Sequence, residues 1–180
     1  MIKNGKNILN SRTIARVFGI VKESIVDGPG LRFVVFFQGC LLKCRGCHNP
    51  LAQNLKGGNE KTVFEIVELI KKNPLLSGIT LSGGEPFLQA KASYEIARFA
   101  KKENLNVITY TGYTMEELFK GLSDHSYWKE LLEQTDILVD GPFIFSKKSL
   151  LLKFRGSSNQ RIVDSKISLK KGKVITKKDF

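Results

Sequence analysis

Apolar runs separated by polar turns predict five strands along the chain. The runs are rich in β-branched and aromatic residues, as is usual for strands that pack on a core. They cover residues 14–21, 31–37, 78–82, 105–110 and 136–140. The second run, Leu-Arg-Phe-Val-Val-Phe-Phe, is nearly all apolar, so we expect it to be more deeply buried than the first.

Helical periodicity fills the intervals between these strands. Thr-x-x-Glu capping boxes stand at 62–65 and 114–117, and each predicts the start of a helix. An apolar stripe over 63–70 continues the first helix, and a further helix is expected over about 90–103. Strands that alternate with helices in this way favour a parallel α/β sheet. About four to six βα units are too few to close an eight-unit barrel, so we expect a single domain built as an open partial (β/α) barrel.

Four unusual segments each follow a predicted strand. They are a cysteine-rich loop after residue 37, Gly83-Gly84, Thr111-Gly112-Tyr113 and Asp140-Gly141-Pro142. Because sites in parallel α/β folds lie at the carboxyl ends of the strands, we expect these segments to meet on one face.

The formal net charge of +12 raises nucleic acid as a partner, but its location weakens that interpretation. Residues 1–16 contribute +4 and residues 166–180 contribute +5, which leaves +3 for the middle of the chain. Basic ends are typical of solvated tails. No run approaches the roughly 18 apolar residues of a membrane span, and no apolar segment follows the basic N-terminus as in a signal peptide. We therefore expect a cytoplasmic protein with no membrane and no nucleic-acid partner.

All three cysteines lie within eight residues, at Cys40, Cys44 and Cys47. A C-x3-C-x2-C triplet can supply three thiolates to one metal centre. A cubane of four irons needs a ligand at each iron, so three cysteines leave one iron open to a substrate or cofactor.

Two other roles for the cysteines fit the sequence less well. Three cysteines cannot all pair as disulfides, and nothing marks the chain as secreted. A structural zinc with His48 as the fourth ligand is possible, although neighbouring ligands at 47 and 48 fit a closed tetrahedral site poorly. A zinc-bearing nucleic-acid-binding module is therefore the alternative from a different functional class.

The triplet followed by Ser82-Gly83-Gly84-Glu85-Pro86 resembles the radical S-adenosylmethionine (SAM) superfamily. The stretch from Glu23 to Cys40, which includes Asp27-Gly-Pro-Gly30, resembles the start of glycyl-radical-enzyme activases. Three later segments resemble one branch of them, the activating proteins of anaerobic (class III) ribonucleotide reductase. These segments are Tyr110–Tyr113, Asp136–Phe143 and Phe154–Arg161, the last reading Phe-Arg-Gly-Ser-Ser-Asn-Gln-Arg. The resemblance places a radical SAM domain at 14–164, between a basic N-terminal extension (1–13) and a basic C-terminal segment (165–180).

The resemblance implies a mechanism and a set of ligands. One [4Fe-4S] cluster would be held by Cys40, Cys44 and Cys47, and SAM would chelate its fourth iron. An electron from the cluster would cleave SAM to a 5′-deoxyadenosyl radical, which takes a hydrogen atom from a glycine of the reductase. No catalytic residue beyond the cluster ligands is then required. The residues expected to line SAM are Gly46, Cys47, His48, Ser82, Gly83, Gly84 and Glu85.

Several roles stay open at this point. The residue before the third cysteine is aromatic in many superfamily members but is Gly46 here, so we expect a backbone contact with adenine and no ring stacking. Asp140 is either a satisfied strand-end carboxylate or a neighbour of a monovalent-cation site. Arg155 and Arg161 either anchor the C-terminal segment or touch SAM or the partner. The partners implied are a large glycyl radical enzyme and, as electron donor, a flavodoxin or ferredoxin that would suit the positive Lys43 and Arg45. Activation of another glycyl radical enzyme, or peptide modification, is the alternative within the same chemistry.

Overall fold

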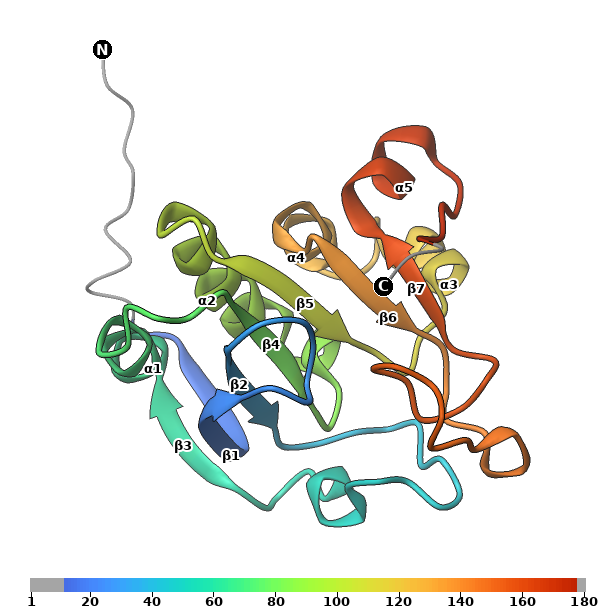
Figure 1. Ribbon diagram of the computed structural model, residues 1–180, viewed down its shortest axis with the longest axis horizontal. Coiled ribbons are helices and arrows are strands. Elements are labelled where there is room, and N and C mark those ends of the chain that lie inside the picture. The colour runs from blue at the N-terminus through green and yellow to red at the C-terminus, as the bar shows by residue number, and fades with distance from the viewer. Residues whose placement is uncertain (1–11, 178–180) are drawn as a thin grey trace.

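The computed structural model describes residues 12–177, which fold around one curved sheet (Figure 1). Residues 1–11 and 178–180, which include most of the expected basic N-terminal extension, lie outside the described part. The described residues form seven strands in the order β3-β1-β2-β4-β5-β6-β7. Their bounds are β1 Ile14–Ser24, β2 Arg32–Phe37, β3 Asn59–Thr62, β4 Gly78–Gly83, β5 Asn106–Tyr110, β6 Ile137–Asp140 and β7 Arg161–Asp164.

The centre of the sheet is parallel and its edges are antiparallel. Strands β2, β4, β5 and β6 pair in parallel, whereas β1 pairs antiparallel with β2 and β3, and β7 pairs antiparallel with β6. The prediction of a parallel sheet is therefore correct for the centre and wrong for the edges. No helix lies between β1 and β2, and none of the α-helices in residues 12–177 lies between β6 and β7; without a helical crossover, an antiparallel return is the usual outcome.

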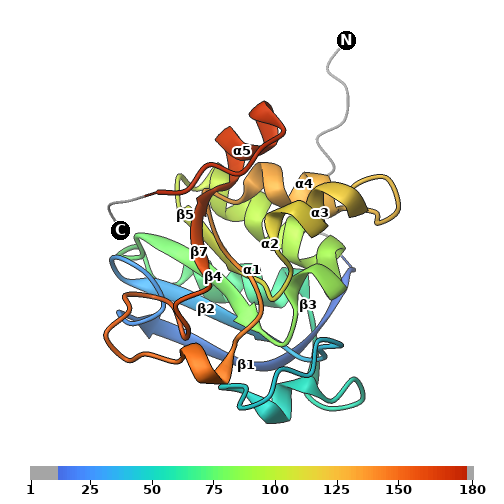
Figure 2. The same cartoon turned by 90° about the vertical axis from the view of Figure 1, so that its right-hand side faces the viewer.

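Helices cover one side of this sheet (Figure 2). They are α1 Val63–Lys71, α2 Ala90–Lys102, α3 Met115–Gly121, α4 Trp128–Gln134 and α5 Ser165–Lys171. Both predicted capping boxes form, at the starts of α1 and α3. The main core lies between helices and sheet, and it joins residues such as Ile66 and Ile96 to Leu81 and Leu138. Among residues 12–177, no helix is both long and apolar enough to cross a membrane. The architecture is an open partial barrel.

The opposite, inner face of the sheet is covered by the loop between β1 and β2. A small apolar cluster of Ile108, Ile137, Val139 and Ile162 lies on this face. A Cβ atom on Gly28 would stand 2.6 Å from Ile108 Cδ1, so this loop lies directly on the cluster. The Asp27–Gly30 loop therefore lines the inside of the partial barrel.

Arg32 ties this loop to the amino ends of three strands. Its buried guanidinium donates to Thr80 Oγ1 (2.7 Å) and to the carbonyl oxygens of Pro29 (3.1 Å) and Asn106 (3.1 Å). Burial lowers the pKa of Arg32 to about 10. These bonds hold the end of the barrel that lies opposite the cysteine loop.

Candidate iron–sulfur and SAM site

The cysteine loop begins where β2 ends and is closed by bonds from its own base. The Gly39 amide donates to the Ala52 carbonyl (2.7 Å), and the Cys40 amide donates to that of Gln53 (3.2 Å). The buried Gln38 side chain donates to two further carbonyls of the same loop. The backbone on both sides of the cysteines is therefore fixed to the carboxyl end of β2.

All three thiols are free and half-buried in this loop. The Cys47 amide donates to the Cys44 carbonyl (3.2 Å), which makes a tight turn between the second and third cysteines. Lys43 and Gly46 have positive φ angles of 47° and 71°, so the triplet contains two left-handed backbone positions. The loop thus presents three sulfur donors from one short stretch of backbone, which is the donor set of a cubane cluster.

In the part of the chain that the structure describes, no three His, Cys, Asp or Glu side chains converge closely enough to hold a metal ion. That finding concerns single ions, which need all their ligands around one point. In a cubane each cysteine binds a different iron, so its thiolates stand further apart. A cysteine must lose its thiol proton to bind iron. Burial raises the pKa of the Cys40 thiol, so this proton is held more tightly than usual.

The Gly-Gly segment packs against the start of the cysteine loop. Strands β2 and β4 are in register from Arg32 opposite Gly78 to Phe37 opposite Gly83, so both loops begin at the same level. The Gly84 amide donates to the Phe37 carbonyl (2.8 Å), and a Cβ atom on Gly84 would stand 2.3 Å from the Gly39 oxygen. Glycine at 84 is therefore required for the two loops to touch.

Glu85 points away from the loop surface into the protein. It is 1% exposed, and its carboxylate accepts bonds from the amides of Phe87 (3.0 Å) and Gly112 (2.9 Å) and from Thr111 Oγ1 (2.9 Å). Burial raises the pKa of Glu85 to about 7, against the effect of these three donors. The side chain joins the loop after β4 to the loop after β5, so only the backbone of Glu85 remains available to line a ligand.

A pH-dependent stability follows from the burial of Glu85. The folded protein binds the proton of the Glu85 carboxyl more tightly than the unfolded chain does. The protonated carboxyl therefore stabilises the fold fully below about pH 4.5, and this stabilisation is lost as the pH rises through about 7. From about pH 5 to about pH 8, the free energy of unfolding of the wild type should fall relative to that of Glu85→Gln, by roughly 2–3 kcal/mol. Urea unfolding of both proteins at the two pH values measures this, and parallel pH profiles would contradict it.

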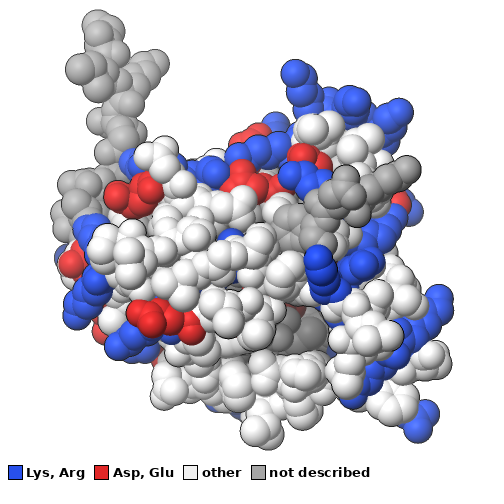
Figure 3. Space-filling model, viewed as in Figure 1, with Lys and Arg blue, Asp and Glu red and all other residues white. Residues whose placement is uncertain are grey.

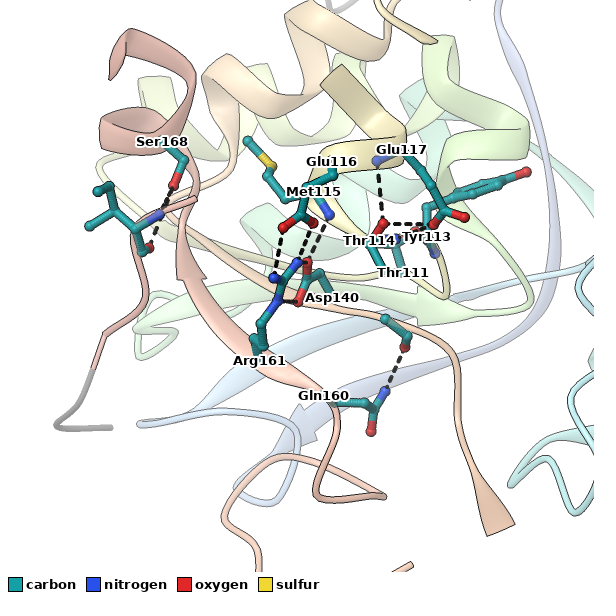
Figure 4. Close-up of polar contacts among 12 residues, drawn as sticks. Thr111, Tyr113, Thr114, Met115, Glu116, Glu117, Asp140, Gln160, Arg161 and Ser168 are labelled. Atoms are coloured by element: carbon teal, nitrogen blue, oxygen red, sulfur yellow. Dashed lines mark hydrogen bonds and ion pairs between the residues drawn. The ribbon is translucent and has the colours of Figure 1, made fainter. Parts of the chain in front are cut away.

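The loops after β5 and β6 are joined by Asp140 and Arg161 (Figure 4). Asp140 is 0% exposed and accepts a bond from the Met115 amide (2.7 Å), while Arg161 Nε donates to its other oxygen (3.0 Å). Arg161 also donates to both oxygens of Glu116 (2.9 and 2.6 Å), which lowers the pKa of Glu116 to about 2. Asp140 is thus a satisfied strand-end carboxylate, and Arg161 anchors β7 to the start of α3.

Removing the Arg161 side chain should destabilise the fold far more than removing that of its exposed partner Glu116. Arg161→Ala leaves the Asp140 carboxylate buried without a cation, and we expect a loss of about 3 kcal/mol in the free energy of unfolding. Glu116→Ala removes an exposed pair and should cost less than about 1 kcal/mol. Denaturant unfolding separates the two, and equal losses would contradict the assignment. In Arg161→Ala, NMR titration should also show the pKa of Glu116 returning toward its ordinary value.

An aromatic ring lies against Gly46 that the sequence did not reveal. It belongs to Phe145, in the connection between β6 and β7, and a Cβ atom on Gly46 would stand 2.5 Å from Phe145 Cδ2. The loop after β6 therefore touches the cysteine loop directly between Cys44 and Cys47. No pattern near Phe145 signals this contact, because it depends on how two distant loops fold back.

The structure thus brings most of the expected site residues to one edge of the sheet. The cysteine loop, Ser82–Gly84 and the loop after β5 are in mutual contact there. His48 is exposed on the cysteine loop. Arg155 donates to the Gln160 carbonyl (3.2 Å) within its own segment.

Comparison with known proteins gives the family of this chain. A family model described as a 4Fe-4S single cluster domain matches residues 26–163. The chain is 35% identical over 132 residues to a pyruvate formate-lyase-activating enzyme of Clostridium pasteurianum, which covers 70% of this chain and 51% of that protein. It is 34% identical over 148 residues to the anaerobic ribonucleoside-triphosphate reductase-activating protein of Enterobacteria phage T4, which covers 76% and 86% respectively.

These matches settle the class: the chain belongs to the 4Fe-4S single-cluster family. Its relatives there include activating enzymes of pyruvate formate-lyase and of anaerobic ribonucleoside-triphosphate reductase. The chain spans about half the length of several pyruvate formate-lyase-activating enzymes that it matches.

Proposed function

We propose that this protein is an oxidoreductase that generates a glycyl radical on anaerobic ribonucleotide reductase. The observation that carries the proposal is the contact between the cysteine loop and the Gly83-Gly84 segment at the carboxyl ends of two paired parallel strands. Three sulfur donors and a side-chain-free backbone edge thereby lie next to each other. Such an arrangement suits a cluster with one open iron and a cofactor that approaches backbone closely.

The residues fit the two cofactors as follows. Cys40, Cys44 and Cys47 would hold one [4Fe-4S] cluster. Gly46, Cys47, His48 and the segment Ser82–Glu85 would line SAM, with Glu85 contributing through its backbone. When bound, the reduced cluster would supply one electron for the cleavage of SAM, and SAM would supply the group that removes a hydrogen atom from a glycine of the partner. The chain's own residues position the two cofactors.

Two observations support the reductase as the target. The Phe154–Arg161 segment resembles the reductase-activating branch, and the match with the phage T4 protein extends over 86% of that protein. Activation of a pyruvate formate-lyase is the second candidate, because enzymes named for that activity are equally similar in identity.

The remaining partners follow from the same chemistry. We place the protein in the cytoplasm, where its three free thiols stay reduced. Lys43 and Arg45 are exposed on the cysteine loop and suit an acidic flavodoxin or ferredoxin as electron donor.

The test is to mix the reduced protein, SAM and the cognate reductase without oxygen and to record electron paramagnetic resonance spectra. A glycyl radical signal on the reductase that depends on SAM is expected. If pyruvate formate-lyase from the same cell is activated and the reductase stays silent, the assignment of the target is wrong while that of the class stands. Release of 5′-deoxyadenosine from SAM without any partner protein tests whether the chain has radical SAM chemistry at all.

A further inference from the structure

A short hairpin extends from the edge of the sheet that carries the cysteine loop. It comprises residues 145–158, and we call it the leucine hairpin. Lys148 and Ser157 form an antiparallel bridge, the Ser149 amide donates to the Gly156 carbonyl (3.3 Å), and the Ser158 amide donates to that of Lys147 (2.9 Å). The hairpin therefore has a defined backbone although it carries no regular strand.

The tip of the leucine hairpin exposes two adjacent apolar side chains. Leu150 is 89% exposed and Leu151 is 94% exposed, and Phe145 at the base is 59% exposed. Scattered exposed leucines are ordinary, but a contiguous group on a projecting loop marks an interaction site. Neither leucine contributes to the two apolar cores of the described residues. Their role is therefore not in folding.

The surroundings of these leucines are basic. Residues 141–160 contain Lys147, Lys148, Lys153 and Arg155 and no acidic residue. Residues 38–58, which include the cysteine loop, contain Lys43, Arg45 and Lys56 and likewise no acidic residue. Figure 3 shows basic side chains at the lower right margin of this face, where the loops after the parallel strands lie. The modest net charge of the middle of the chain thus hides a strongly basic surface at one edge.

The leucine hairpin is attached to the cysteine loop. Phe145, its first residue, packs on Gly46 between the second and third cysteines. The hairpin is therefore joined at its base to the cysteine loop.

We propose that the leucine hairpin is the docking element for the glycyl radical protein, inserting Leu150 and Leu151 into an apolar pocket rimmed by acidic residues. The inference rests on the proposed function, since it concerns the protein that receives the radical. Interfaces that must hold a partner in place are anchored by a few buried apolar side chains inside a charged rim. Electron-donor complexes are small, weak and mainly steered by charge, so they do not need exposed leucines. Complementary charge speeds encounter, and the leucines provide the lasting contact.

The test compares Leu150→Ser/Leu151→Ser with Leu75→Ser. Leu75 is also exposed (76%), but it precedes β4 and so lies at the amino ends of the parallel strands, away from the cysteine loop. With dithionite as reductant, both variants should release 5′-deoxyadenosine from SAM at the wild-type rate when no partner is present. Affinity for the glycyl radical protein, and radical formation at limiting partner concentration, should fall by at least about tenfold in the double variant alone.

Charge-reversal variants test the role of the basic residues around the two leucines. Lys147→Glu/Lys148→Glu/Lys153→Glu should weaken the same complex and remove much of its salt dependence, whereas Lys170→Glu/Lys171→Glu/Lys173→Glu, with the same change in charge, should not. Wild-type affinity of the leucine variant would overturn the inference. So would a defect that appears only with flavodoxin as reductant, because the hairpin would then bind the donor. If the wild type itself releases no 5′-deoxyadenosine, the proposed function fails first.

Discussion

Replacing Cys44 by alanine is expected to abolish the iron–sulfur cluster. Reconstituted wild-type protein should contain about four irons per chain, the content of one cubane. In Cys44→Ala only two thiolates remain, and residues 12–177 contain no other cysteine that could replace the third. Iron content should therefore fall to well below one per chain, with loss of the brown colour and of all SAM cleavage. Iron analysis and absorption spectra after anaerobic reconstitution measure this.

The control for Cys44→Ala is Leu41→Ala, in the same loop. Leu41 is largely exposed, so its loss leaves the three thiolates in place and the iron content unchanged. Retention of about four irons by Cys44→Ala would remove the cysteine triplet from the centre of the mechanism. One zinc per wild-type chain with no iron would do the same and would return attention to the Cys3His alternative with His48.

Gly84→Val should eliminate both SAM binding and stable cluster binding. From the sequence alone, a side chain at position 84 is expected to weaken SAM binding and leave the cluster, because it would intrude where backbone must approach the cofactor. The structure adds a collision with the Gly39 carbonyl, whose neighbour is Cys40, so the cysteine loop itself must shift. We expect the free energy of unfolding to drop by about 2–4 kcal/mol, as is usual for overpacking against backbone.

Gly19→Ala and Gly84→Ala form the matched pair for this prediction. A Cβ atom on Gly19 meets nothing within 4 Å, whereas one on Gly84 meets backbone at 2.3 Å. Iron content, SAM binding by equilibrium dialysis and urea unfolding should all be near normal in the first variant and impaired in the second. If Gly84→Ala keeps its cluster and loses only SAM, the contact between the loops is less rigid than the structure shows.

The elements that the sequence predicted are those with a strong local signal. The five predicted strands and the capped helices α1 and α3 all form near the expected bounds. Strand β3, with the sequence Asn-Glu-Lys-Thr, has no apolar residue and exists because β1 offers it an open edge. Helix α4 has only seven residues, and its N-cap Tyr127 carries no capping bond. Strand β3 and helix α4 form because they pack against the rest of the protein, and local sequence patterns do not predict such packing.

The same division holds at the site. The cysteine spacing and the Gly83-Gly84 pair are compact patterns, and both lie where the parallel strands end. The inward direction of the Glu85 side chain depends on donors in the loop after β5, which only the fold brings near. The position of Phe145 likewise depends on the path of the long connection between β6 and β7.

The contact between Phe145 and Gly46 has an evolutionary consequence. The two residues share one volume, so an aromatic side chain at position 46 would displace the Phe145 ring and the base of the hairpin with it. The positive φ of Gly46 adds a backbone cost to any such change. A lineage that exchanges Gly46 for an aromatic residue must therefore reduce residue 145 as well. Mutations at the two positions should be strongly epistatic, with an aromatic residue at position 46 less damaging when residue 145 is small.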